Sequence, residues 1–309
     1  MPKKVLTSQM LPKQKKLKIV PVGFVCICVL PALFMVSVFI LYPTSQALLM
    51  SFYDTSNLAL GFGNFIGIDN YVQMFTGDIN FRTALYNTMR LMAVVPLVTV
   101  FLAMLFAFAL TQSKLKEKGI YRVIFFFPSI LSLVVVAAVW SALLGPTSRD
   151  PVNRVLGWFN IDPIMWLGDV RFALWAIAIV MIWQAVGYYM VLLLSSVDSI
   201  NKEIFEAAEI DGAGGASKLF RITMPLIKDQ IGICYVLSIA GTMGISFTLT
   251  WVMTDSGPGT ATLVLLGYIF RAGFQAAAFG YAMAVVVFSI VLALTLSVLS
   301  RKLSYQSNL

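Results

Sequence analysis

A glycine-rich stretch, residues 212–218, is the part of the sequence that most suggests chemistry, because it reads Gly-Ala-Gly-Gly-Ala-Ser-Lys. A phosphate-binding P-loop needs a second glycine directly before its lysine, a Ser or Thr directly after it, and an apolar strand leading into the loop. Here Ser217 and Leu219 occupy those two positions, and no apolar strand precedes Gly212. The pattern GxGxxG also fails at Ser217. We therefore interpret the stretch as a structural turn and expect the chain itself to bind no nucleotide or other cofactor.

Most of the residues that build common catalytic and metal sites are missing. The chain contains no histidine, which excludes a Ser-His-Asp triad, His-containing zinc sites and histidine proton relays. Its three cysteines, Cys26, Cys28 and Cys234, lie in apolar stretches and are expected to pack as small apolar side chains. There is also no GxSxG motif and no carboxylate inside a long apolar stretch. The sequence therefore predicts neither an enzyme nor a metal site.

The composition indicates a membrane protein. Hydrophobic residues make up 59% of the 309 residues and charged residues only 12%, whereas soluble proteins carry about 25% charged residues. An ionised side chain costs roughly 2.5 to 3.5 kcal/mol at the centre of a membrane helix, so charge-free stretches mark candidate spans. A spanning helix needs about 20 residues, and six stretches exceed this length: residues 19–53, 91–113, 123–148, 172–197, 230–254 and 272–300. The sequence thus predicts an all-α polytopic membrane protein with six transmembrane helices.

The distribution of basic residues predicts how these spans are oriented. The net charge is +8, and 16 of the 22 Lys and Arg residues lie on the side that carries the N-terminus. Because Lys and Arg are enriched on the cytoplasmic side of membranes, both termini are expected to be cytoplasmic. The chain then divides into a basic N-terminus, residues 1–18, and a six-helix transmembrane domain, residues 19–309. We interpret the basic N-terminus as an orientation signal in contact with membrane lipid, not as a nucleic-acid-binding arm.

One predicted cytoplasmic loop, residues 198–229, differs from this basic pattern. It holds six of the fourteen acidic residues: Asp198, Glu203, Glu206, Glu209, Asp211 and Asp229. Helix-forming residues fill positions 202–210, and Gly212 follows where the C-terminus of a helix favours glycine. A second short helix is expected over residues 216–221, and Pro225 precedes the fifth span. The loop is therefore expected to form a pair of short helices at the membrane surface.

The same loop carries a spaced motif. It reads Glu206-Ala207-Ala208, three residues, Gly212, nine residues, then Ile222-Thr223-Met224-Pro225. This resembles the signature EAA-x3-G-x9-I-x-L-P of the permease subunits of binding-protein-dependent ABC importers, with Met224 in place of Leu. Further segments resemble the first permease of sugar importers of the maltose, glycerol-3-phosphate and multiple-sugar type: residues 65–71, 127–140, 166–169 and 280–282. A late outer loop departs from that subfamily, because Ser256 stands where its G-G-P motif begins with Gly.

The resemblance implies the type I ABC importer permease fold and a transport subunit, not an enzyme. It implies that residues 202–210 form a coupling helix in a cleft of an ABC ATPase dimer, which binds ATP and magnesium. A helix this short cannot bury Ile204 and Phe205 by itself, so both are expected to face the partner's groove. Glu206 would make a charge-assisted contact with the ATPase. The coupling residues implied are Glu206, Ala207, Ala208, Gly212, Ile222, Pro225 and Phe205.

Other partners are implied by the same resemblance. They are a second, homologous permease subunit in a heterodimer, an extracytoplasmic solute-binding protein, and an oligosaccharide or related sugar as the transported substrate. The location implied is the plasma membrane of a bacterium or archaeon. The same permease fold importing a non-sugar solute is the alternative that the sequence leaves open.

The translocation path is indicated only by polar and aromatic residues in the fourth and fifth spans. The candidates are Gln184, Tyr188, Tyr189, Ser246, Thr248, Thr250 and Trp251. Aromatic faces with a few hydroxyl groups suit sugar rings, but membrane helices use the same residue types for packing, and both interpretations stay open. No charged residue lies in the middle of a span and no internal repeat is visible. A secondary transporter or channel that acts alone is therefore the less favoured alternative.

Overall fold

The computed structural model describes residues 22–56, 61–112 and 117–306, with side chains from residue 27 to residue 299 within these ranges. The chain falls into two compact units, Met1–Gln46 and Ala47–Leu309. In the first unit, α1 (Val22–Val36) continues through a π-helical segment, η1 (Ser37–Leu41), into α2 (Tyr42–Met50), whose last residues belong to the second unit. The helical stretch Ile27–Met50 is long and apolar enough to cross a membrane.

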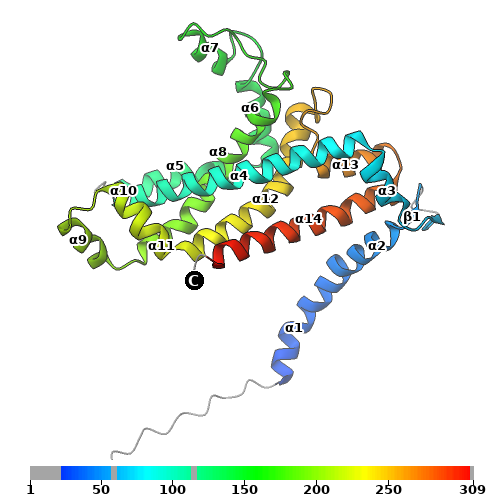
Figure 1. Cartoon of the computed structure of the whole chain (residues 1–309), viewed down its shortest axis with the longest axis horizontal. Coiled ribbons are helices and arrows are strands. Elements are labelled where there is room, and N and C mark those ends of the chain that lie inside the picture. Colours follow the sequence, from blue (N-terminus) through cyan, green and yellow to red (C-terminus); the bar gives the residue numbers. More distant parts are fainter. Residues whose placement is uncertain (1–21, 57–60, 113–116, 307–309) are drawn as a thin grey trace, which may run out of the picture. The chain divides into compact units, whose positions relative to one another are not determined.

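Four long helices form the framework of the second unit (Figure 1): α4 (Ile79–Gln112), α8 (Ala173–Asp198), α12 (Lys228–Thr254) and α14 (Phe279–Gln306). Each contains a segment long and apolar enough to span a membrane. A helix satisfies its own backbone hydrogen bonds, as an apolar environment requires. α8 packs along α4, and α12 lies against α4, α8 and α14. The predicted all-α polytopic fold is therefore confirmed.

The third predicted span is a bent pair of helices. α5 (Lys118–Ile130) and α6 (Leu133–Leu143) meet at 99°, and Leu131 and Ser132 between them have extended ψ angles of 144° and 133°. Pro128 in the last turn of α5 provides no backbone N–H to the helix, which weakens it at this point. The span predicted over residues 123–148 is thus present as two helices joined by a bend close to Pro128. With the pair counted as one crossing, the described residues contain six candidate spans.

Short elements connect the long helices. They are β1 (Tyr53–Asp54), β2 (Asn64–Phe65), α3 (Asp69–Thr76), α7 (Pro151–Gly157), α9 (Lys202–Ile210), α10 (Gly215–Ser217), η3 (Lys218–Thr223), α11 (Met224–Leu226), α13 (Leu265–Phe270) and η4 (Arg271–Gln275). The two strands pair antiparallel, with Tyr53 opposite Phe65. Gly280 in the first turn of α14 lies against the first strand, and a Cβ there would be only 1.9 Å from the Tyr53 carbonyl oxygen. Glycine is required at this position because the two backbones touch.

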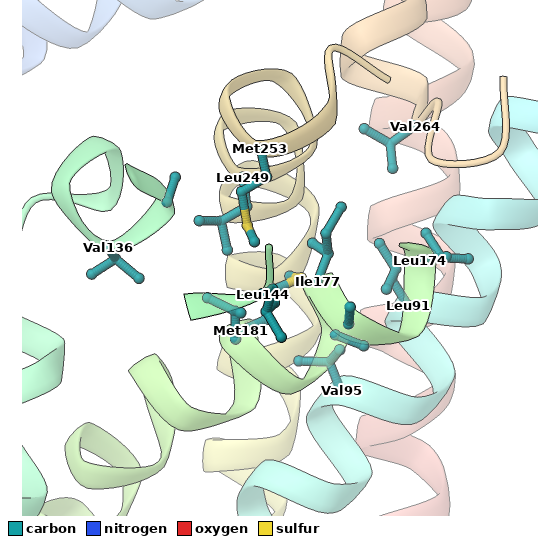
Figure 2. Close-up of a cluster of buried hydrophobic side chains, with 14 residues drawn as sticks. Leu91, Val95, Val136, Leu144, Leu174, Ile177, Met181, Leu249, Met253 and Val264 are labelled. Atoms are coloured by element: carbon teal, nitrogen blue, oxygen red, sulfur yellow. The ribbon is translucent and has the colours of Figure 1, made fainter. Parts of the chain in front are cut away.

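A buried apolar cluster holds α4, α6, α8 and α12 together, and Figure 2 shows its side chains converging from these helices. Leu91, Ile177 and Leu249 are fully buried in it. α5 approaches α8 so closely that a Cβ on Gly187 would lie 1.8 Å from the carbonyl oxygen of Phe125. A second apolar cluster, at the end of the unit that carries α10 and α11, joins residues of α4 and α8 to η3 and to the start of α12. These two clusters fix the framework on which the loop between α8 and α12 is mounted.

Candidate coupling site and polar residues of the spans

The helix expected over residues 202–210 is present as α9 with the same bounds. Its first turn is capped by Asn201, whose side-chain oxygen accepts a hydrogen bond from the Glu203 N–H at 3.1 Å. The amide nitrogen of Asn201 also donates to the Glu203 carboxylate at 3.1 Å. A capping residue of this kind stabilises a helix by about 1 kcal/mol. Local sequence is thus sufficient to decide where α9 begins.

α9 ends in a glycine turn, as predicted for Gly212. This residue has a φ of +76°. The Ala213 N–H donates to the Ala208 carbonyl at 2.8 Å, and the Gly212 N–H donates to the Glu209 carbonyl at 3.0 Å. This pair of bonds is the Schellman motif, which satisfies the last carbonyl groups of a helix. A Cβ on Gly212 would meet no atom within 4 Å, so the left-handed backbone, and not a lack of space, favours glycine here.

The second helix of the loop is longer than the expected residues 216–221. α10, η3 and α11 follow one another from Gly215 to Leu226. The Thr223 hydroxyl donates to the Lys218 carbonyl at 2.9 Å across the wide π-helical turn. Pro225 lies in the first turn of α11, where a helix tolerates proline, and its predicted place before the fifth span is confirmed. Ile222 is half-buried and Pro225 is exposed.

The side chains of α9 separate into a buried and an exposed face. Phe205 and Ala208 are buried within the chain. The expectation that Phe205 faces a partner is therefore wrong, since the chain's own residues cover it. Ile204 is 40% exposed, as expected, and Ile210 is 88% exposed. The exposed residues Glu203, Glu206, Ala207 and Ile210 recur at helical spacing, and they form one acidic face with an apolar end.

Polar contacts tie the neighbouring helix ends together. The carboxylate of Asp198, at the end of α8, accepts hydrogen bonds from Arg122 of α5 at 3.2 Å and from the Thr111 hydroxyl of α4 at 3.0 Å. Lys118 donates to the Thr111 carbonyl at 3.0 Å. These contacts bring the ends of α4, α5 and α8 to the end of the unit that carries α9 and α10 (Figure 1). These helix ends therefore share one side of the second unit, as the charge pattern predicts. Which side is cytoplasmic stays a prediction.

The predicted substrate-path residues of α8 lie in different environments. Gln184 and Tyr189 are buried at 8% and 7% exposure, whereas Tyr188 is 44% exposed. The two tyrosine rings meet edge to face at 5.1 Å. A Cβ on Gly241 would lie 3.7 Å from the Tyr189 hydroxyl, so Tyr189 packs against α12. Of these three, Tyr188 is the side chain most accessible to a ligand.

The predicted substrate-path residues of α12 also lie in different environments. The Thr250 hydroxyl donates to the Ser246 carbonyl at 2.8 Å, and the Ser246 hydroxyl donates to the Met243 carbonyl at 2.9 Å. Both hydroxyls therefore bond to their own helix, and both residues are buried, which favours the packing interpretation for them. Thr248 and Trp251 are half-buried, and the Trp251 ring lies 5.0 Å from that of Phe270. None of the seven candidates lines the cavities of about 510, 530 and 340 Å³ found among the described residues.

A polar cluster at the start of α4 was missed by the sequence analysis. Asp78 accepts the Phe81 N–H at 2.9 Å and also the hydroxyl groups of Tyr268 and Tyr281. Burial by itself raises the pKa of Asp78, but these hydrogen bonds outweigh it and hold the pKa below its ordinary value. The cluster lines a cavity of about 530 Å³ together with Arg271. The one available sequence signal was an Asp before an apolar helix, which predicts a cap but not the two tyrosines.

The expectations for cysteine packing and for metal binding can be compared with the structure only where side chains are described. Cys234 is fully buried among apolar residues, which agrees with a packing role, whereas Cys28 is exposed. The side chain of Cys26 lies outside the described residues. Among the side chains that the structure describes, no three His, Cys, Asp or Glu residues gather as metal ligands.

The apolar spans are those of a multi-pass membrane protein, with an exposed pair of short helices between α8 and α12. The chain matches the model of the family described as binding-protein-dependent transport system inner membrane component over residues 74–305. It belongs to this family, and so is a transport component of the ABC importer type.

Relatives and solved structures agree with this assignment. The diacetylchitobiose uptake system permease protein NgcF of Streptomyces coelicolor is 35% identical over 258 residues, which cover 80% of this chain and 72% of the relative. The lactose transport system permease protein LacF of Rhizobium radiobacter is 31% identical over 277 residues, covering 88% and 90%. A chain of a bacterial ABC transporter involved in the import of the acidic polysaccharide alginate aligns with a TM-score of 0.80 and 25% identity, covering 92% and 96%. That type of transporter has also been solved in complex with an alginate pentasaccharide-bound periplasmic protein.

Proposed function

We propose that this chain is a permease subunit of an ATP-driven ABC importer for oligosaccharides or related sugars. The relatives bear the names of diacetylchitobiose and lactose systems, and the structural neighbour is an alginate importer. The observation that carries the proposal is the loop formed by α9, the Gly212 turn and η3, which presents the spaced Glu206-Ala207-Ala208 motif beside the ends of three spans. A stand-alone transporter has no need of such an exposed helix.

An ABC ATPase dimer is the partner that suits the exposed face of α9. Ile210 needs an apolar groove, since it is 88% exposed in the chain. Ala207 is small enough to allow the two backbones to approach closely, and Glu206 can form a charge-assisted hydrogen bond with a basic residue. ATP and magnesium would bind to the ATPase, with no cofactor bound by this chain. Closure of the ATPase dimer would move α9 and switch the spans between inward-facing and outward-facing states.

Two further partners complete the proposed importer. A solute-binding protein would deliver the sugar to the outer side, which the complex of the alginate transporter with its periplasmic protein supports. A second, homologous permease would form a heterodimer with this chain in the plasma membrane of a bacterium or archaeon. Within the chain, Tyr188, Thr248 and Trp251 keep exposed surface and are the better candidates for contact with a sugar. A different solute on the same permease fold is the alternative.

The test is purification of the tagged chain from its own membrane, followed by uptake assays in liposomes. An ATPase and a second permease should co-purify, and a labelled oligosaccharide should be taken up only with ATP and the binding protein present. Glu206→Ala should lower ATP-driven uptake by at least about tenfold, because a buried charge pair is worth 2 kcal/mol or more at an interface. Asp162→Ala, an exposed acid on the predicted outer side, serves as the control. Uptake by the chain alone without ATP would refute the importer, and uptake of only non-sugar solutes would refute the substrate class.

A further inference from the structure

α9 buries Phe205 and Ala208 against the rest of the chain and leaves its other side chains exposed. No other helix packs broadly along it in the described part of the chain. Its C-terminal half is joined to the next segment by an ion pair, in which Lys218 Nζ donates to Glu209 Oε1 at 2.6 Å. The two residues lie on opposite sides of the Gly212 turn. The pair therefore closes that turn and connects α9 to η3 through side chains as well as through the backbone.

Lys218 is enclosed to a degree that is unusual for a lysine. Only 9% of its side chain is exposed, against 66% for the side chain of Glu209. A buried ammonium group left without a partner is strongly destabilising, so the position of Lys218 requires the Glu209 carboxylate to stay close. The Thr223 hydroxyl holds the Lys218 carbonyl at 2.9 Å, and Thr223 is itself fully buried. Lys218 is thus part of a rigid segment that keeps Glu209 beside it.

The segment that carries Lys218 is anchored in the bundle. Leu219 and Ile227 are 5% and 6% exposed and belong to the apolar cluster that contains Met104 of α4 and Met190 of α8. η3 also continues through α11 into α12. A continuous set of contacts thus runs from α9 through Glu209, Lys218 and Leu219 into three spans.

We propose that Lys218 and Glu209 are a positioning pair that makes α9 and the spans move as one body. This inference rests on the proposed function, since it concerns how motion of an ATPase reaches the spans. Gly212 has a backbone that glycine adopts with little restriction, and by itself it would act as a hinge. The ion pair across the turn prevents that hinge from bending when α9 is displaced. Without the pair, ATP hydrolysis would continue while part of the motion is lost in the turn.

A double-mutant cycle in the complete importer, reconstituted in liposomes, tests the pair. The variants are Lys218→Met, Glu209→Ala and the two together, with Arg149→Met as the control because Arg149 is an exposed basic residue on the predicted outer side. The measurements are sugar imported per ATP hydrolysed and the amount of assembled complex. Each single variant should lower import per ATP by about fivefold, and the double variant should be no worse than the poorer single variant, as for residues that act as one unit. Arg149→Met should leave the ratio within about twofold of the unchanged chain, as surface substitutions usually do.

The possible results distinguish a failure of this inference from a failure of the proposed function. An unchanged import-to-ATP ratio in Glu209→Ala, or effects of the two substitutions that multiply in the double variant, would overturn the positioning pair. Lys218→Met alone carries the test if Glu209→Ala fails to assemble, because Lys218→Met removes the buried ammonium group, whereas Glu209→Ala leaves it without a partner. If the unchanged chain shows no ATP-driven uptake, the proposed function itself fails. If it transports sugar normally and the variants do too, only the pair fails.

Discussion

Removal of the Asp78 carboxylate should loosen the end of the bundle where α4 begins. One oxygen caps α4 through the Phe81 N–H, and the other accepts the hydroxyls of Tyr268 on α13 and Tyr281 on α14. Loss of the cap costs about 1 kcal/mol, and each lost bond to a charged group costs about 1.5 kcal/mol. Because Asp78 is only half-buried, water replaces part of this loss. We expect Asp78→Ala to lower the free energy of unfolding by about 3 kcal/mol.

The same contacts give the stability of this region a pH dependence of defined sign. The hydrogen bonds hold the pKa of Asp78 below its ordinary value of 3.8 in the folded chain. A carboxyl group with a lowered pKa stabilises the fold fully above its unfolded value and loses this contribution as the pH falls through the folded value. The unchanged chain should therefore lose stability below about pH 4, and Asp78→Asn should lack that part of the loss.

Thermal unfolding of the purified chain in detergent at pH 7 measures the effect. A loss of 3 kcal/mol corresponds to a fall in Tm of about 6–12 °C, whereas the exposed control Asp162→Ala should shift Tm very little. Tyr268→Phe and Tyr281→Phe should each lower Tm in the unchanged chain and have no effect once Asp78 is alanine. A Tm for Asp78→Ala equal to that of the control, or tyrosine effects that persist without the carboxylate, would refute the reasoning.

Two glycine substitutions test the backbone geometry of the loop and of the spans. Gly212→Ala forces a Cβ into a left-handed backbone at φ +76°, at a cost of about 1–2 kcal/mol. ATP-driven uptake should fall more than for Gly214→Ala, whose φ is −69°, and equal effects would contradict the turn. Gly187→Ala places a Cβ 1.8 Å from the Phe125 carbonyl oxygen, so α5 must move from α8 and Tm should fall by several degrees. Gly244→Ala meets no atom within 4 Å, and a Tm for Gly187→Ala as high as that of this control would show that the close approach is absent.

The parts of the structure that could be predicted are those decided by neighbours in sequence. α9 begins after Asn201 and ends before Gly212 because a cap and a left-handed glycine act over only a few residues. The long spans could be predicted because the absence of charge over more than about 20 residues has only one common explanation. The position of Pro225 before α12 could be predicted because proline is favoured in the first turn of a helix, which is also a local preference.

The features that escaped prediction depend on residues far apart in the chain. Asp78 meets Tyr268 and Tyr281 across separations of 190 and 203 residues, which no local pattern encodes. The bend of 99° between α5 and α6 could not be predicted in size, because Pro128 marks a weak point in a helix but does not decide the angle at which the two parts pack. Phe205 was expected to face a partner because a helix as short as α9 cannot bury it alone, but the packed chain shows that it is buried by other residues of the same chain.

By itself, the sequence determined that this chain crosses the membrane, where its spans lie, and which loop carries the spaced Glu206-Ala207-Ala208 motif. These properties depend on transfer of side chains into lipid and on local backbone preferences, which act residue by residue. Only the tertiary structure decided which side chains of that loop remain available, and that Lys218 lies beside Glu209 across the Gly212 turn. The reason is that burial and ion pairing depend on how distant segments pack, and the same composition is compatible with many packings.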